Sequence, residues 1–146
     1  ILSRNQQEVE QTLRRWNLPR EAVTVEAVMH EDMPRWLSRA DAGLAFYKEG
    51  PARQGTCPTK IGEYLAMGLP VVVNRAVGDV EELIEQNGIG SVVNEFTPSD
   101  YERVLKRLRS LWSDPNLSSR CRQVAAERCS LGLGVERYWA IYRRLA

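Results

Sequence analysis

The sequence has 146 residues, 43% of them apolar and 27% charged, and its formal net charge is +1. This length fits one domain with a single core, and the balanced charge gives no overall reason to expect nucleic acid, whose binding requires many phosphate contacts. Three cysteines without close pairing, no apolar stretch near the ~18 residues of a membrane span and no visible signal peptide favour a reduced, cytoplasmic setting.

The apolar pattern alternates between helix and strand along the chain. Val9, Leu13 and Trp16 recur at helical spacing, and Pro19 ends that first helix. β-branched residues then predict a strand. In chain order we expect helices over 5–17, 31–40, 59–67, 78–88, 99–112, 117–129 and 134–145, and strands over 22–28, 41–47, 71–74 and 90–96.

The alternation predicts the fold class. Four short strands separated by helices favour an α/β fold, with a parallel sheet that carries helices on both faces. The chain begins "ILSRNQQ" without Met, and residues 1–3 resemble the end of a strand. We therefore expect a fragment of a longer protein whose first strand–helix units precede it. Within 1–146 we expect one domain, with a closing C-terminal helix in 131–146.

The segment "KEGPARQGTCP" (48–58) is the first candidate for function. It is long for a link in a compact α/β unit, and it leaves the carboxyl end of a strand, where such sheets bind ligands. It leads into a helix N-terminus, whose first amides lack internal partners and suit a phosphate. Gly55 allows close backbone approach, Thr56 and Thr59 can cap the helix or donate a hydroxyl, and Pro58 fits its start.

Lys60 and Glu63 share one face of that helix. A cation in the first turn opposes the helix dipole unless an anion is bound there, and a carboxylate accepts two hydroxyl hydrogen bonds, as from a ribose diol. Ile61 and Leu65 lie on another side and can pack on the sheet. The pattern predicts a nucleotide with its diphosphate at the helix start and its ribose against Glu63. The simpler alternative is an exposed i,i+3 ion pair between Lys60 and Glu63.

These motifs resemble a known family. "ADAGLAFY" and "GTCPTKIGEYLAMGLPVVVN" are similar to the donor-binding half of retaining glycosyltransferases with the B-type fold, of the family-4 kind. That family's core, E-[AY]-x-A-x-G-x-P-V-V, corresponds to residues 63–72. "VMHEDMPRWLSRADAGL" matches the segment before this core, and "VGDVEELIEQNGIGSVV" and "VERYWAIYRRL" match two segments after it. The resemblance implies a Rossmann-like domain, the C-terminal half of a two-domain enzyme, which binds a UDP-, GDP- or ADP-sugar.

The resemblance also implies roles for residues. Glu63 would hold the ribose hydroxyls, residues 58–60 would lie along the diphosphate, and His30 would be near the base. Gly55 occupies the position of a second Glu that the family often has, and "CPTKIGEY" is close to the S-P-x-K-x-x-E-Y version of a related subset. Lys60 and Glu63 are the candidate catalytic residues. The candidate donor-binding residues are Gly55, Thr56, Cys57, Pro58, Thr59, Lys60, Glu63 and His30.

The implied activity is glycosyl transfer with retention at the anomeric carbon in the full-length parent, with no metal or other cofactor. The acceptor would be bound mainly by an N-terminal domain, so the isolated fragment is expected to be inactive. Two alternatives remain. One is a non-enzymatic nucleotide- or phosphate-binding signalling module, for which Asp41 and Asp79 are the candidate acids, and the other is a sugar-nucleotide epimerase of the same architecture.

The basic stretches "KRLR" (106–109) and "YRRLA" (142–146) could contact anionic lipid or a partner. Charge runs are usually solvated faces, and we expect Tyr138, Trp139 and Tyr142 to pack. Peripheral membrane contact is therefore the less favoured interpretation. The cysteine at 57 is interpreted as a small loop residue rather than a nucleophile, because no neighbouring base is evident.

Overall fold

The computed structural model describes residues 1–3, 5–48, 50, 55 and 58–145. The chain divides into two compact units, Ile1–Arg39 and Ala40–Ala146, which are described here one at a time. The sequence-based expectation of one domain over 1–146 stays a prediction.

The first unit contains two α-helices and two short 3-10 helices. Asn5 caps the first α-helix because its Oδ1 accepts a hydrogen bond from the Glu8 amide at 3.3 Å. The second α-helix begins with Pro34 in its first turn, where a missing N–H costs little. In chain order the elements are α1 (Gln6–Arg15), η1 (Arg20–Ala22), η2 (His30–Asp32) and α2 (Met33–Leu37).

The predicted strand over 22–28 is wrong. This segment makes one isolated parallel bridge, between Leu2 and Glu26. The Ser3 amide donates to the Glu26 carbonyl at 2.9 Å, and the Glu26 amide donates to the Ile1 carbonyl at 3.0 Å. The pairing is not extended, because the chain enters α1 soon after Ser3, with Asn5 as the N-cap of that helix.

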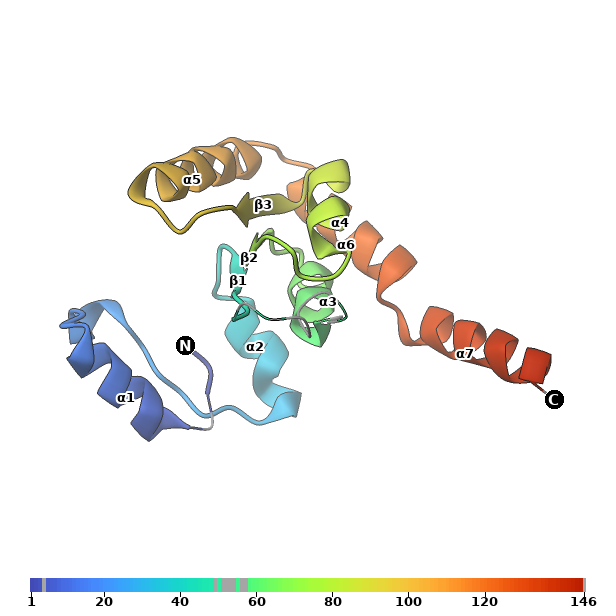
Figure 1. Ribbon diagram of the computed structural model, residues 1–146, viewed down its shortest axis with the longest axis horizontal. Helices are drawn as coiled ribbons and strands as arrows, with labels where there is room; N and C mark the ends of the chain where they lie inside the picture. The colour runs from blue at the N-terminus through green and yellow to red at the C-terminus, as the bar shows by residue number, and fades with distance from the viewer. Residues whose placement is uncertain (4, 49, 51–54, 56–57, 146) are drawn as a thin grey trace. The chain divides into compact units, whose positions relative to one another are not determined.

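The second unit has the predicted α/β fold with a parallel sheet, which contains three strands rather than the four expected (Figure 1). The strand order is β1-β2-β3, and Gly43 pairs with Val71, which in turn pairs with Gly90. Its elements in chain order are β1 (Gly43–Ala45), α3 (Thr59–Ala66), β2 (Val71–Asn74), α4 (Val80–Asn87), β3 (Gly90–Val93), α5 (Pro98–Trp112), α6 (Leu117–Arg128) and α7 (Leu131–Leu145).

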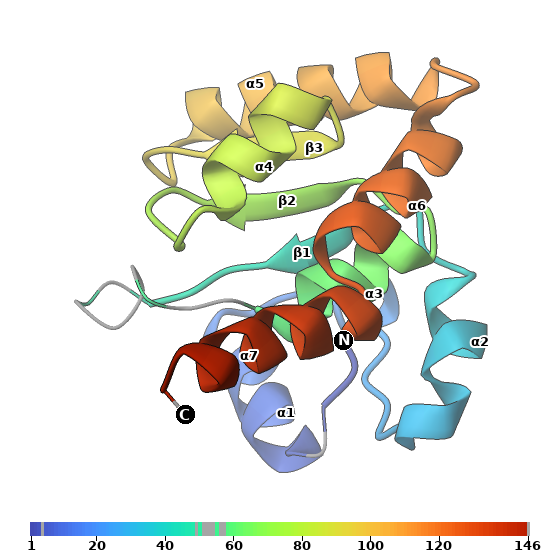
Figure 2. The same cartoon turned by 90° about the vertical axis from the view of Figure 1, so that its right-hand side faces the viewer.

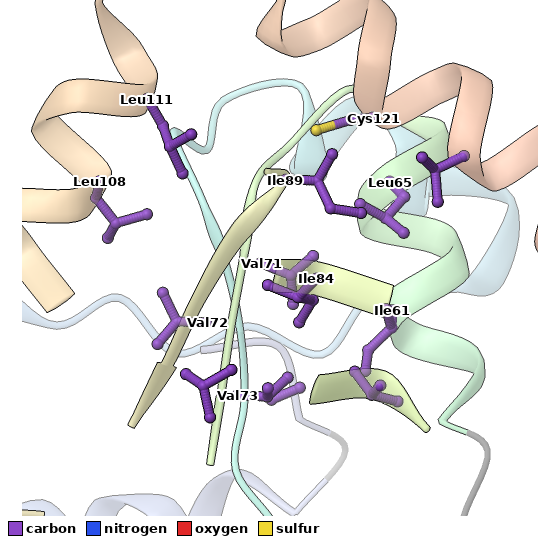
Figure 3. Packing of buried hydrophobic residues seen from close by; sticks show 14 of the residues in the cluster. Ile61, Leu65, Val71, Val72, Val73, Ile84, Ile89, Leu108, Leu111 and Cys121 are labelled. Carbon is purple, nitrogen blue, oxygen red and sulfur yellow. The ribbon is translucent and has the colours of Figure 1, made fainter. Parts of the chain in front are cut away.

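Helices bury both faces of this sheet. Alternate residues of β2 point to opposite sides. Figure 3 shows Val71 directed toward Ile84 of α4, and Val72 directed toward Leu108 of α5. Val71 and Ile84 are fully buried, and burial of each such side chain is worth about 1.5–3 kcal/mol. β2 and β3 are therefore covered on both sides, whereas Leu44 of the edge strand β1 is 60% exposed.

Two helices end at glycines. Gly68 follows α3 with φ +79°, and Gly88 caps α4 with φ +57°. Both are in the left-handed region that favours glycine. These stops turn the chain from α3 into β2 and from α4 into β3, so that all three strands run in the same direction.

The closing helix α7 contradicts one expectation. Tyr138, Trp139 and Tyr142 were expected to pack, yet they are 66%, 58% and 62% exposed, and α7 has no buried residue in the described part of the chain.

Candidate functional site

The segments that follow the three strands meet at one edge of the sheet (Figure 2). At this edge Asn74, the last residue of β2, is 1% exposed. Its Nδ2 donates to the Tyr47 carbonyl at 2.9 Å, and its Oδ1 accepts from the Tyr47 amide at 2.8 Å. The two bonds fix the chain just beyond β1, immediately before the candidate segment 48–58.

The start of α3 presents backbone amides at the positions that the sequence singled out. Pro58 is the N-cap residue, and no side chain caps the helix. The Ile61 amide donates back to the Pro58 carbonyl at 3.1 Å, whereas the amides of Thr59 and Lys60 donate to no described residue. Thr59 does not cap the helix, because it is the first residue inside it, and its other expected role, as a hydroxyl donor to an anion, stays a prediction.

The first turn of α3 contains a cation and no acid. Lys60 is exposed and Glu63 is half-buried one turn further on. Three ion pairs join described residues, Arg20–Glu10, Arg103–Asp100 and Arg120–Asp114, and Lys60 and Glu63 belong to none of them. The ion pair required by the simpler alternative is therefore not formed, and both charges remain open to a ligand.

Tyr64 anchors this helix on the sheet. A Cβ on Gly43 would collide with the Tyr64 ring, so the ring lies directly against the β1 backbone. The Tyr64 hydroxyl also reaches the Leu44 carbonyl at 3.5 Å. Burial, then the adjacent carboxylate of Glu63 and then Tyr47, raises the pKa of the Tyr64 hydroxyl. Tyr64 is therefore a neutral packing residue at neutral pH.

Two acids that sequence reasoning did not single out hold the neighbouring loops. After β2, Glu81 accepts from the amide of Ala76 at 3.2 Å, and Ala76 has φ +60°. After β3, Asp100 accepts from the Asn94 amide at 2.6 Å and the Glu95 amide at 3.1 Å. The two loops beside the candidate site are thus tied to the helices that come after them.

One of these acids had a sequence signal. Thr97 caps α5 by accepting from the Asp100 amide at 3.3 Å, and the two residues stand three apart, the spacing of a capping box. The α5 start at Pro98 follows from this cap. Asn74 had no such signal, because its partner Tyr47 is 27 residues away in the chain.

The other predicted site residues fall in different places. Gly55 is exposed, with open space where a Cβ would stand. Thr56 and Cys57 lie outside the described residues. His30 belongs to the first unit, where with Leu2, Ser3, Val28 and Met33 it lines a recess of about 180 Å³. The structure thus groups Pro58, Thr59, Lys60 and Glu63 at the start of α3.

The acids considered for a signalling module do not come together. Asp41 precedes β1, and Asp79 follows β2 at the N-cap of α4, so they stand at opposite ends of parallel strands. The described residues contain no group of three or more His, Cys, Asp or Glu side chains that could hold a metal ion. Among the helices they form, none has the length and apolar character to cross a membrane.

Comparison with known proteins gives one match. Residues 2–114 match the family model described as "Glycosyl transferases group 1". No curated protein and no solved structure matches the chain. The matched range contains the sheet, the start of α3 and the residues that hold the neighbouring loops, and it ends just after α5.

Proposed function

This chain belongs to the group 1 glycosyl transferases, and we propose that the start of α3 binds the nucleoside diphosphate of a sugar donor. One observation carries the proposal. The amides of Thr59 and Lys60 have no acceptor among the described residues, a lysine accompanies them, and the first turn contains no acid. These two amides, the positive end of the helix and a cation together favour a diphosphate.

Glu63 supplies the second half of the proposed site. It lies about one turn beyond the amides and has no cationic partner among the described side chains. A carboxylate beside a bound diphosphate is unfavourable unless it accepts hydrogen bonds, and the ribose hydroxyls supply two donors. Glu63 therefore selects a nucleoside diphosphate over an inorganic one, while Lys60 and the amides bind either.

The same groups have a role in the transfer. When the bond between the sugar and the diphosphate breaks, negative charge grows on the departing diphosphate. Lys60 and the amides of Thr59 and Lys60 are fixed by α3 before the reaction, so they stabilise that charge without rearranging. We propose that the full-length protein has the B-type fold, transfers the sugar with retention and needs no metal, and that its acceptor is bound by another domain.

Titration of this chain with UDP, GDP, ADP and inorganic diphosphate, followed by amide NMR and calorimetry, tests the site. We expect amide shifts that cluster at 59–63. Glu63→Ala should weaken the best nucleoside diphosphate about tenfold or more, the worth of a hydrogen bond to a charged group. Binding of inorganic diphosphate should be unchanged. The matched control is Glu82→Ala, which removes an exposed acid from α4.

Equal losses for both ligands would contradict the ribose role of Glu63, and binding of no diphosphate by the unmodified chain would contradict the site as a whole. In the full-length parent, release of free nucleoside diphosphate with a glycosylated acceptor supports transfer. Conversion of one sugar nucleotide into another would instead identify an epimerase.

His30 enters the proposal separately, as a contact for the base. The recess that it lines contains the apolar side chains of Leu2, Val28 and Met33 together with Ser3, so a heterocycle could find both apolar contact and hydrogen-bond partners there. His30→Ala should change the relative affinities of UDP, GDP and ADP. It should leave inorganic diphosphate binding unaltered, and identical ratios in the variant and the unmodified chain would remove His30 from the site.

A further inference from the structure

Tyr47 follows β1 at the edge of the sheet where the proposed donor site lies. The chain keeps the alternation of a strand there. Phe46 is on the α5 side, because its ring centroid lies 5.8 Å from that of Phe96, which in turn lies 6.5 Å from the ring of Tyr101 in α5. Tyr47 is on the other side, where it packs against the buried core and lies close enough to Tyr64 of α3 for the two hydroxyls to interact electrostatically. The Tyr47 side chain therefore shares a face of the sheet with α3.

The spacing along β1 and α3 places Tyr47 beside the first turn of the helix. β1 and β2 are parallel neighbours, so α3, which connects them, runs in the opposite direction and begins at the edge where β1 ends (Figure 2). The Tyr64 ring lies against Gly43. Tyr47 is four residues beyond Gly43, about 13 Å along the strand. Thr59 is five residues before Tyr64, about 7.5 Å along the helix. Tyr47 is therefore level with the start of α3 or beyond it, and not with Glu63.

The backbone of Tyr47 is fixed, whereas its hydroxyl is unused. Asn74 binds the Tyr47 amide at 2.8 Å and the Tyr47 carbonyl at 2.9 Å. The hydroxyl makes no hydrogen bond to any residue that the structure describes. In that part of the chain Arg120 Nε is the one fully buried side-chain polar atom without a partner, so the Tyr47 oxygen is not sealed from solvent. Burial of the ring raises the pKa of the hydroxyl, which is therefore a neutral O–H donor at neutral pH.

We propose that the Tyr47 hydroxyl donates a hydrogen bond to the diphosphate of the sugar donor, an inference that rests on the site proposed at the start of α3. The amides of Thr59 and Lys60 and the lysine side chain are donors without an acceptor among the described residues, and the phenol adds a further donor at the same level. A group that meets only donors must be an acceptor-rich anion, to which hydrogen bonds are stronger than between neutral groups. Because Asn74 fixes the Tyr47 backbone before the ligand arrives, the hydroxyl needs little rearrangement to bind. The ribose, which donates as well as accepts, would remain with Glu63.

Calorimetric titration of the 146-residue chain tests the assignment with two probes, inorganic diphosphate and whichever of UDP, GDP and ADP binds best. Tyr47→Phe keeps the ring and removes the hydroxyl. It should weaken both probes equally, about tenfold or more, whereas Glu63→Ala should weaken the nucleoside diphosphate alone. In a chain with isotope-labelled tyrosine, the ring signals of Tyr47, identified by their loss in Tyr47→Phe, should shift in the NMR spectrum when inorganic diphosphate is added.

The matched control is Tyr101→Phe, which removes a hydroxyl from the α5 side of the sheet and should leave both affinities unchanged. Urea unfolding should be the same for Tyr47→Phe and the unmodified chain, because the two bonds from Asn74 go to the Tyr47 backbone. Equal affinities of Tyr47→Phe and the unmodified chain would overturn the assignment of Tyr47 and leave the site at α3 in place. A loss confined to the nucleoside diphosphate would also overturn it, because Tyr47 would then contact the nucleoside. If the unmodified chain binds no diphosphate, the site and the assignment are both wrong.

Discussion

The side-chain amide of Asn74 makes two hydrogen bonds to the backbone of Tyr47, through its Oδ1 and its Nδ2. These bonds join the chain beyond β1 to the end of β2. The two contacts lie beyond the parallel pairing of β1 with β2, because Tyr47 is two residues after Ala45, where β1 has already ended. They satisfy the Tyr47 N–H and C=O in a partly buried place, where an unpaired backbone group is costly. They also set the direction in which the chain leaves the sheet toward residues 48–58.

Asn74→Ala should therefore lower the free energy of unfolding more than the loss of a few side-chain atoms alone would. The substitution leaves the Tyr47 N–H and C=O without partners, at a cost of about 1–3 kcal/mol for each buried group. Urea unfolding measures the loss. Asn87→Ala is a matched control, because its Nδ2 makes one bond, to the Leu83 carbonyl at 2.8 Å, and its removal should cost about 1 kcal/mol. Similar losses in the two variants would mean that the double contact to Tyr47 adds nothing.

Gly43→Ala should also destabilise the chain, for a steric reason. The new Cβ would collide with the ring of Tyr64, and overpacking of this kind typically costs about 1–3 kcal/mol. Tyr64→Ala in the same chain should relieve the collision, so the double variant should be more stable than the sum of the two single losses predicts. Gly55→Ala, where a Cβ has open space, should leave the unfolding free energy unchanged. Strict additivity of the two losses would contradict a direct contact.

The sequence predicts the sheet where its signals are local. β2 occupies Val71–Asn74 as predicted, because a run of β-branched residues follows Gly68 and Pro70. The strand expected over 22–28 fails because β-branched residues favour an extended chain without supplying a neighbour to pair with. The start of α7 at Leu131, rather than 134, could not be read from Gly132 and Gly134, which are poor helix formers.

In the candidate site, too, the features with local sequence signals were predictable and those that depend on tertiary contacts were not. The spacing of Lys60 and Glu63 already places them on one face of α3. Whether they pair with each other is decided by side-chain conformations that spacing leaves open, and in the structure they do not pair. The Asn74 and Asp100 contacts depend on which strands and loops lie side by side. The sequence alone therefore does not predict the Asn74 contact, and for Asp100 it predicts only the helix cap with Thr97.

Asp100 should make stability depend on acid pH. Burial disfavours its charged form, but hydrogen bonds from the Glu95 amide, the Arg103 guanidinium and the Asn94 amide outweigh it, and the pKa of Asp100 falls below its ordinary 3.8. The folded chain binds this proton less tightly than the unfolded chain does. The ionised carboxylate therefore contributes its full stabilisation at pH values above the ordinary pKa of 3.8, and this stabilisation is lost as the pH falls through the lowered pKa of the folded chain. Urea unfolding across this range measures the loss.

Two variants at this position give the control. Asp100→Asn should be less stable than the unmodified chain at neutral pH, and the difference should shrink as the pH falls. Arg103→Gln keeps the carboxylate but removes its charged partner, whose Nε lies 2.8 Å from Oδ1, so its pH dependence should be intermediate. A difference for Asp100→Asn that stayed constant with pH would show that the carboxylate charge is not what stabilises these loops.

Lys60→Gln should affect binding and stability in opposite directions. Without a ligand, a cation in the first turn of α3 faces the positive end of the helix dipole, so its removal should stabilise the chain by about 0.3–1 kcal/mol. With a diphosphate bound, the same cation is attractive, so the variant should bind UDP and inorganic diphosphate with equal losses, unlike Glu63→Ala. Calorimetric titration and urea unfolding measure the two effects, and Lys106→Gln, an exposed lysine in the middle of α5, should show neither. A Lys60→Gln chain that is less stable than the unmodified one, or that binds inorganic diphosphate equally well, would place Lys60 outside the diphosphate site.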